Sequence, residues 1–205
     1  MAVQIVKNFI SPELAQKIVS GYSDLLPETP ETFQEIVKPV WLWNLWVRHP
    51  DETKEGYPLF NIEGNISDSE LVSEVILLIK DKLEKVFGAN LTAFEAGLVR
   101  MDQGASNGLH ADICNVDGSP FEGAPNGANH LEYSALLYLC NHGEDFTGGE
   151  IVFPKQELKI EPKAGMLVLF PGDTEHIHEV RKVLSGHRYG IAMLFGTEFS
   201  AAYES

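Results

Sequence analysis

The sequence is short of cationic side chains, of cysteine and of long apolar runs. Its 205 residues include 15 lysines and arginines against 30 aspartates and glutamates, giving a formal net charge of -15 at pH 7. Such a charge repels the phosphate backbone that dominates nucleic-acid affinity, so no nucleic-acid partner is expected. Cys114 and Cys140 are too few for a disulfide framework and lack the paired spacing of a zinc ribbon, so we expect two reduced, structural thiols.

No segment is apolar over the roughly 18 consecutive residues that a membrane helix needs. The N-terminal segment is interrupted by Lys7, Asn8 and Pro12 and has no signal-peptide core. We therefore expect a soluble, cytoplasmic protein without membrane partners. The composition, 44% hydrophobic and 22% charged, is that of a globular protein and excludes a disordered tail, a collagen-like repeat or a coiled coil. The length favours a single domain, residues 1–205.

Helical signals are concentrated in the first 90 residues. Ser11-Pro12-Glu13 is typical of a helix start and predicts a helix to about Leu26. Ser67-Asp68-Ser69-Glu70 is a capping box, and it predicts a second helix with apolar residues at helical spacing until Gly88 ends it. Between these helices the aromatic run at residues 41–47 predicts a strand with its three tryptophans in the core.

From Leu91 onward the chain has short β-branched and aromatic runs separated by glycine, proline and aspartate turns. The predicted strands are 94–101, 133–140, 150–153, 158–160, 166–170, 178–183 and 188–195. This spacing is typical of a β-sandwich or barrel. We therefore expect an α+β protein in which a helical support region, residues 1–90, packs against a β-rich core, residues 91–200. The glycine- and asparagine-rich segment 113–132 is expected to be a functional loop rather than a disordered insertion.

Two groups of side chains could ligate a metal. His110 and Asp112 are two positions apart, so on an extended strand they would share a face, although a lone His-x-Asp pair is more often a surface hydrogen bond. His176 and His178, after the Pro171-Gly172 turn, offer a third ligand. Two imidazoles and one carboxylate form the facial triad that holds non-haem Fe(II) with open positions.

Arg188 begins the last predicted strand, ten residues beyond His178. Its planar guanidinium could bind a carboxylate through two hydrogen bonds. Formal charges favour such a role: Fe(II), Asp112 and a bound 2-oxoglutarate leave a net charge of -1, which is costly to bury, and Arg188 brings it to zero.

From about Leu98 to Gly196 the chain resembles the 2-oxoglutarate and Fe(II)-dependent oxygenases, and specifically their prolyl 4-hydroxylase-like branch. Several blocks match the family's pattern in order: His110-x-Asp112, Ser134-Ala-Leu-Leu-Tyr138-Leu139, Gly148-Gly149-Glu150-Ile-Val-Phe153-Pro154, Pro162-Lys-Ala-Gly165, and His178-Glu-Val-x-x-Val-x-x-Gly186-x-Arg188. The resemblance implies a double-stranded β-helix core, the jelly-roll or cupin-like fold, with the N-terminal helices packed against it.

The resemblance also assigns the site. It implies His110, Asp112 and His178 as metal ligands, because His178 and not His176 stands in the family's frame. Tyr138 and Arg188 would bind the distal carboxylate of 2-oxoglutarate, although a plain core tyrosine is the alternative for Tyr138. Ser134 and His176 are candidates for supporting the ligands from outside, and His176 could equally be a rim histidine.

One part of the family's pattern is missing. Many members carry a further cosubstrate tyrosine on the strand before the first histidine, where this chain has Met101 as the nearest match. Arg100 could substitute for it, or could be a surface partner of Asp102. The carboxylate at Asp112, where related halogenases have a small residue, favours hydroxylation.

The function that the resemblance implies is hydroxylation of a C–H bond, with Fe(II), 2-oxoglutarate and O2 as cofactors and ascorbate as a candidate auxiliary reductant. A prolyl residue in a peptide or protein is the first expected substrate. A free amino acid or another small molecule is the alternative, and a non-catalytic cupin-like metal- or ligand-binding module is a third. His49, His142 and His187 are expected to be exposed, and His130 is left unassigned.

Overall fold

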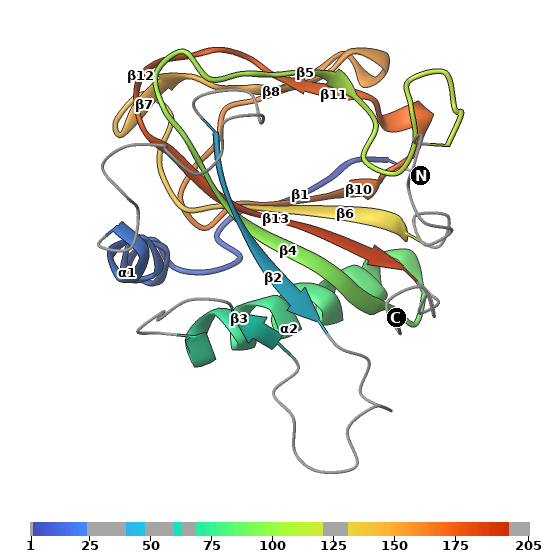
Figure 1. Cartoon of the computed structure of the whole chain (residues 1–205), viewed down its shortest axis with the longest axis horizontal. Coiled ribbons are helices and arrows are strands. Elements are labelled where there is room, and N and C mark those ends of the chain that lie inside the picture. Colours follow the sequence, from blue (N-terminus) through green and yellow to red (C-terminus); the bar gives the residue numbers. More distant parts are fainter. Residues whose placement is uncertain (1, 24–39, 48–59, 63–68, 121–130, 197–205) are drawn as a thin grey trace.

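The computed structural model describes residues 2–23, 40–47, 60–62, 69–120 and 131–196. Within these ranges the chain is an α+β protein with two α-helices beside antiparallel sheets, as expected (Figure 1). The predicted features at 24–26, His49 and His130 lie outside the described residues, as do the side chains of the three tryptophans. Neither described helix is long and apolar enough to cross a membrane.

The helices are α1 (Pro12–Ser23) and α2 (Ser69–Phe87). The strands are β1 (Gln4–Val6), β2 (Val40–Val47), β3 (Phe60–Ile62), β4 (Thr92–Met101), β5 (Asn107–His110), β6 (Leu131–Tyr138), β7 (Phe146–Gly148), β8 (Ile151–Phe153), β9 (Leu158–Ile160), β10 (Leu167–Pro171), β11 (His178–Val180), β12 (Val183–Gly186) and β13 (Arg188–Gly196).

The centre of the molecule is a seven-stranded sheet with the order β1-β10-β6-β13-β4-β2-β3. A four-stranded sheet with the order β5-β11-β8-β9 lies on one side of it, and α2 lies on the other (Figure 1). Along the chain the strands alternate between the two sheets: β4, β6, β10 and β13 belong to the large sheet, whereas β5, β8 and β11 belong to the small one. This alternation is that of a jelly roll, which the resemblance implied.

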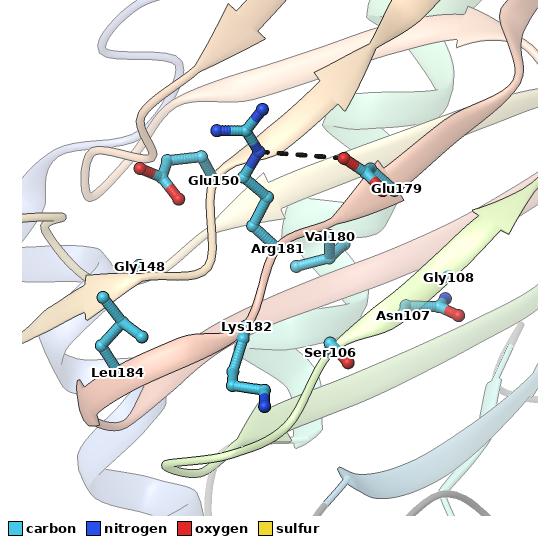
Figure 2. Close-up of a pocket in the computed structure, with 10 residues that line it drawn as sticks. All are labelled: Ser106, Asn107, Gly108, Gly148, Glu150, Glu179, Val180, Arg181, Lys182 and Leu184. Carbon is cyan, nitrogen blue, oxygen red and sulfur yellow. Dashed lines mark ion pairs between the residues drawn. The ribbon is translucent and has the colours of Figure 1, made fainter.

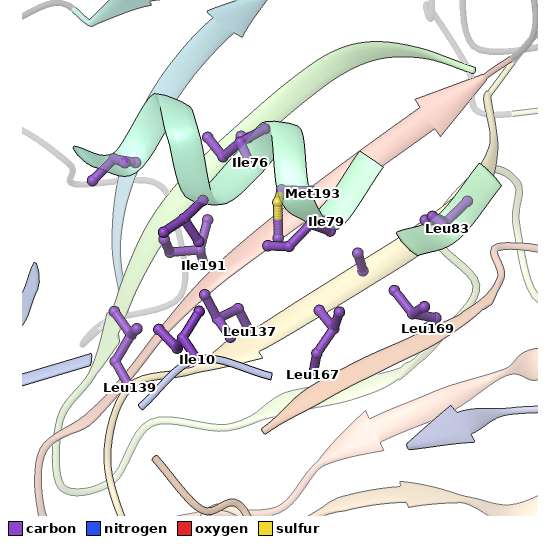
Figure 3. Close-up of a cluster of buried hydrophobic side chains, with 14 of the residues drawn as sticks. Ile10, Ile76, Ile79, Leu83, Leu137, Leu139, Leu167, Leu169, Ile191 and Met193 are labelled. Carbon is purple, nitrogen blue, oxygen red and sulfur yellow. The ribbon is translucent and has the colours of Figure 1, made fainter. Parts of the chain in front are cut away.

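Both faces of β10 in the large sheet are buried, and neighbouring residues of this strand enter different cores. On β10, Leu167 and Leu169 pack with α2, whereas Val168 and Phe170 pack with the small sheet. Figure 3 shows the first of these cores between α2 and the strands of the large sheet. Strands buried on both faces are apolar throughout, which explains why the run from Met166 to Phe170 shows no alternation.

The predicted strands are present, with one error. The run 178–183 is not a single strand, because the chain bends after Val180 and begins β12 at Val183, leaving Arg181 and Lys182 between. The first 90 residues also supply β1, β2 and β3 to the large sheet. This region therefore contains more strands than the expected helical support region. Gly88 ends α2 with a φ of 70° and donates its N–H to the Glu84 carbonyl, as the sequence predicted.

The helix–sheet core makes a stability prediction. Ile79 is 0% exposed on the face of α2 that meets the large sheet, so Ile79→Ala should lower the free energy of unfolding by about 2–5 kcal/mol. Leu78 precedes it on the same helix and is 56% exposed, so Leu78→Ala should change that free energy by less than about 0.5 kcal/mol. Chemical denaturation of both variants measures the difference, and equal losses would contradict this packing.

Candidate metal centre

His110, Asp112 and His178 come together at the end of the small sheet. Each offers one ligand atom, and within the described residues these three atoms lie within 4.8 Å of one another. The strand pairing explains the approach of the histidines: His178 on β11 lies opposite His110 on β5, and their ring centroids are 4.3 Å apart. The sequence prediction of these three residues as one cluster agrees with this geometry.

Asp112 is not on the same strand as His110, as the i and i+2 spacing predicted, because β5 ends at His110. The turn after β10 places it instead. The Asp112 N–H donates to the Gly172 carbonyl at 3.0 Å, and the Ile113 N–H donates to the same oxygen at 3.3 Å. A Cβ atom at Gly172 would lie 2.8 Å from Ile113 Cγ2 and 3.3 Å from Ser134 Oγ, so a larger residue there would displace the Asp112 segment.

Both histidines are held in the tautomer that a metal requires. His110 Nδ1 lies 2.6 Å from the Gly108 carbonyl, and His178 Nδ1 lies 3.1 Å from the His176 carbonyl. Because a carbonyl only accepts, each Nδ1 carries the proton and each Nε2 presents its lone pair, which at His110 also faces the Asn107 amide at 3.3 Å. The two Nε2 atoms lie 3.4 Å and 3.7 Å from Asp112 Oδ1, so all three donor atoms face a common point.

The Asp112 carboxylate is oriented by Ser134 on β6. The Ser134 hydroxyl donates to Asp112 Oδ2 at 2.5 Å, and Ser134 is 1% exposed. This hydrogen bond occupies one carboxylate oxygen and leaves Oδ1 toward the histidines. This hydrogen bond agrees with the prediction that Ser134 supports a metal ligand.

Electrostatics favour the ligating forms of Asp112 and His178. Burial acts to raise the pKa of Asp112, but the neighbouring His110 and His178 rings and the Ser134 hydroxyl outweigh it and lower that pKa. Burial lowers the pKa of His178 and keeps its imidazole neutral. For His110, burial acts to lower the pKa, but the hydrogen bond and charge of Asp112 outweigh it and raise that pKa.

The metal centre is buried on the His178 side and partly exposed on the His110 side. His178 is 3% exposed and packs against the rings of Phe153 and Phe170, with centroid distances of 5.2 Å and 4.9 Å. The His110 side chain is 29% exposed. Within the described residues the His110 side is therefore the more exposed side of the three donor atoms.

Arg188 and Tyr138 form the second half of the site, inside the barrel. Arg188 is 5% exposed and Tyr138 is 1% exposed, and the guanidinium carbon lies 5.1 Å from the centre of the tyrosine ring. Within the described residues, Arg188 Nε and the Tyr138 hydroxyl have no hydrogen-bond partner. Burial raises the pKa of Tyr138, with the charge of Arg188 opposing this effect, so the phenol stays protonated. Two buried donors without acceptors mark a place for an anionic group.

Two neighbours shape the space around Arg188. Gly149, with a φ of 66°, packs so closely that a Cβ atom there would lie 3.0 Å from Arg188 Cδ, which gives the Gly-Gly-Glu motif a physical role. Met101 lies opposite Arg188 across β4 and β13, and its sulfur accepts a hydrogen bond from Arg188 Nη1 at 3.2 Å. Arg100 donates to Asp102 at 2.8 Å instead. Met101 rather than Arg100 therefore occupies the position of the family's missing tyrosine.

The other histidines considered in the sequence analysis agree only in part with their predicted exposure. His176 is 3% exposed, ends a 3₁₀ turn and contacts Asp173 at 2.6 Å, so of its two predicted roles the rim histidine is wrong. The His142 side chain is 18% exposed and not the exposed group expected, because Glu150 and Glu161 flank it. The His187 side chain is 57% exposed, as predicted. Sequence reasoning missed Asn107, whose amide nitrogen lies 3.3 Å from His110 Nε2.

The three ligand atoms fit Fe(II), the metal that the family resemblance implied. Two neutral imidazole nitrogens and one carboxylate oxygen on one side of a point are the ligands of non-haem Fe(II). Tyr138 belongs to the same buried cluster as Phe153 and Phe170, whose rings pack against His178, so the unsatisfied donors and the triad share one core. A dicarboxylate cosubstrate beside the metal would satisfy them.

Comparisons with known proteins agree with this geometry. A family model described as the 2OG-Fe(II) oxygenase superfamily matches residues 96–196. The chain is 42% identical over 67 residues to 2-oxoglutarate and iron-dependent oxygenase domain-containing protein 3 of Rattus norvegicus, a match that covers 32% of this chain and 21% of that protein. It is 34% identical over 101 residues to prolyl 3-hydroxylase 3 of Homo sapiens, covering 46% of this chain and 13% of that protein.

The matched part thus spans about a fifth or less of the length of these relatives. A solved structure, viral collagen prolyl hydroxylase from Paramecium bursaria Chlorella virus-1, aligns with a TM-score of 0.61 at 16% sequence identity and covers 97% of both chains. At this identity the likeness shows a common fold. With the matching family model and the His-Asp-His cluster, it shows that the chain belongs to the 2OG-Fe(II) oxygenase superfamily through its jelly-roll core.

Proposed function

We propose that this oxygenase hydroxylates a C–H bond of a prolyl residue in a peptide or protein. The observation that carries the proposal is that a three-ligand metal site shares its core with the buried pair Arg188 and Tyr138, whose Nε and hydroxyl have no hydrogen-bond partner within the described residues. Prolyl hydroxylases among the relatives and solved structures support the substrate class. A non-catalytic metal-binding module would have no use for a carboxylate clamp behind the metal.

The residues of this chain have separate tasks in that reaction. His110, Asp112 and His178 would hold Fe(II) from one side and leave the opposite positions open. Fe(II) with 2-oxoglutarate and O2 supplies the oxidising power, and 2-oxoglutarate leaves as succinate and CO2. Arg188 would bind the distal carboxylate through its planar fork, and the Tyr138 hydroxyl would donate to the same carboxylate.

The surroundings of the site serve these tasks. Arg188 cancels the charge that would otherwise remain on the buried assembly. Phe153 and Phe170 keep water from the His178 side, where it would weaken the electrostatic interactions. Ser134 holds Asp112 in one orientation, so that a single carboxylate oxygen faces the metal.

The substrate assignment is tested by a panel of proline-containing peptides, free proline and other free amino acids. Succinate formation and a mass increase of one oxygen atom are measured for each compound. We expect coupled turnover with a peptide and none with free amino acids. Coupled turnover confined to a free amino acid would replace the peptide with a small-molecule substrate, and failure to bind metal and 2-oxoglutarate would contradict the oxygenase itself.

Substituting His178 and His176 one at a time distinguishes the metal ligand from a residue that only supports it. His178→Ala removes a metal donor, so substrate-independent conversion of 2-oxoglutarate to succinate should fall to background. His176→Ala should retain this turnover, because His176 contacts His178 through its backbone carbonyl. Thermal unfolding of both variants checks that they fold. Equal loss of turnover in two folded variants would show that the ligand assignment is wrong.

Substituting Arg188 or Tyr138, the proposed carboxylate clamp, should weaken 2-oxoglutarate binding and leave metal binding unchanged. Arg188→Ala removes charge-assisted hydrogen bonds worth about 1.5–3 kcal/mol, which corresponds to about 10- to 150-fold weaker 2-oxoglutarate binding. Tyr138→Phe removes one neutral donor, with an expected loss of about 2- to 10-fold. Calorimetric titration of Mn(II)-loaded protein measures both. Unchanged 2-oxoglutarate affinity in Arg188→Ala would refute the clamp.

Ser134→Ala should weaken the metal site itself. The substitution frees Asp112 Oδ2 to rotate, and loss of such an outer partner costs about 10- to 100-fold in metal affinity. Ser134→Thr keeps the hydroxyl and should retain most of the affinity. Mn(II) titration followed by electron paramagnetic resonance gives the dissociation constants, and indistinguishable values for the alanine and threonine variants would dismiss the role of the hydrogen bond.

A further inference from the structure

Arg188 lies at the end of its strand pairing, where a strand is held least firmly. On the β4 side, its pairing with Met101 is the first of the register between β13 and β4. On the β6 side, the paired residues begin two positions later, with Gly190 opposite Tyr138. Local opening costs the least free energy at such ends of an element. The position of the guanidinium therefore depends on contacts made beyond the paired residues.

One such contact lies directly beyond the Met101–Arg188 pair. Asp102 follows Met101 at the end of β4, and His187 precedes Arg188 at the start of β13. His187 Nδ1 lies 2.6 Å from Asp102 Oδ1. Because a carboxylate only accepts, the imidazole donates this hydrogen bond. The two side chains thus join β4 to β13 one residue beyond the last pair of the two strands.

The Asp102 carboxylate is held from a second side by Arg100 on β4. Its other oxygen, Oδ2, accepts a hydrogen bond from Arg100 Nη2 at 2.8 Å. The Arg100 and Asp102 side chains are 18% and 20% exposed, so this ion pair is partly shielded from water and from salt. With both oxygens engaged, the carboxylate presents Oδ1 to His187 in one orientation.

The backbone around Asp102 is anchored to the chain that leads to β12. The Asp102 carbonyl accepts from the Ala105 N–H at 2.9 Å. The Gly104 N–H donates to the Val183 carbonyl at 2.8 Å, and the Val183 N–H donates to the Ala105 carbonyl at 2.8 Å. Figure 2 shows residues 181–184, which contribute to the wall of a pocket. The turn that carries Asp102 is therefore fixed to this segment by its own backbone.

The chain immediately before Arg188 is also fixed. Gly186 ends β12 with a φ of 74°, and a Cβ atom there would clash with the Asp145 carbonyl, so this turn requires glycine. His187 is the single residue between the end of β12 and the start of β13. A contact that holds the His187 side chain therefore sets the direction in which the chain enters β13.

The guanidinium of Arg188 needs such support because its own partners are weak. Its Nη1 donates to the Met101 thioether, a weak acceptor, and its Nε has no partner within the described residues. A planar fork binds a carboxylate through two parallel hydrogen bonds, which requires the correct orientation. Misplacement of a binding group by about 1 Å is costly. In the protein without cosubstrate, the position of the strand must therefore orient the fork.

We propose that Asp102 and His187 are positioning residues that hold Arg188 in the orientation that binds the distal carboxylate of 2-oxoglutarate. The inference rests on the proposed function, because it assigns two further residues to the cosubstrate clamp. The His187 side chain is 57% exposed, so it acts from the protein surface through the backbone of Arg188. The hydrogen bond between these two side chains links the end of β4 to the residue before the clamp.

Calorimetric titration of the Mn(II)-loaded full chain with 2-oxoglutarate tests the proposal. His187→Ala removes the contact and should weaken 2-oxoglutarate binding about two- to fivefold, the loss expected for a partly exposed pair. His187→Asn places an amide donor near the position of Nδ1 and should retain most of the affinity. In an Asp102→Ala background, His187→Ala should cause no further loss, because its partner is already gone. The Mn(II) affinity should be the same in every variant.

Ser185→Ala is the matched control. Ser185 lies three residues before Arg188, and its hydroxyl lies 2.7 Å from the Thr147 hydroxyl across β12 and β7. This substitution also removes a contact between side chains of paired strands, but at a distance from the β4–β13 end, so 2-oxoglutarate affinity should not change. Thermal unfolding of each variant confirms folding.

Four results would overturn the positioning role: unchanged 2-oxoglutarate affinity in His187→Ala, an equal loss in His187→Asn, an equal loss in Ser185→Ala, or a parallel loss of Mn(II) affinity. A parallel loss would show a general disturbance of the barrel. Failure of the unsubstituted protein to bind 2-oxoglutarate would instead contradict the proposed function, and the inference with it. The two failures are distinguished by the titration of the unsubstituted protein.

Discussion

The site depends on a cation buried without its counter-ion. Arg188 is 5% exposed, its Nε lacks an acceptor within the described residues, and its Nη1 donates to a thioether. Thioether sulfur is a weak acceptor and does not neutralise a guanidinium. An arginine in this state is costly in the empty protein and favourable once a carboxylate arrives. The metal triad, the glycine beside Arg188 and the Tyr138 hydroxyl all surround the place where that carboxylate would bind.

The jelly roll brings these groups together by strand pairing. Register between β5 and β11 sets His110 against His178, and register between β4 and β13 sets Met101 against Arg188. The large sheet also separates two cores, one with α2 and one with the small sheet. On β6, Leu137 and Tyr138 are neighbours in sequence but belong to different cores, so the packing of α2 supports the strand that carries the clamp.

Much of this arrangement could be predicted from the sequence, because the metal ligands and Arg188 stand in ordered blocks with few alternatives. Ligand geometry could not be predicted in full. Asp112 is positioned by backbone hydrogen bonds to Gly172, sixty residues later in the sequence. No local sequence pattern predicts a backbone hydrogen bond over such a separation. Asn107 was missed for a similar reason, since a polar residue on a short edge strand has no periodicity. The rim alternative for His176 failed because a 3₁₀ turn, which the sequence did not predict, buries its side chain.

The clamp lies on regular secondary structure throughout. Arg188 begins β13, whose neighbours β4 and β6 carry Met101 and Tyr138. The metal ligands, by contrast, lie at strand ends and beside a turn. In the proposed function, cosubstrate recognition would thereby be fixed by the spacing of a sheet, which tolerates little change, while the turns around the metal can vary in length and composition. A lineage with this scaffold can therefore acquire new substrates by remodelling its turns and keep the same cosubstrate.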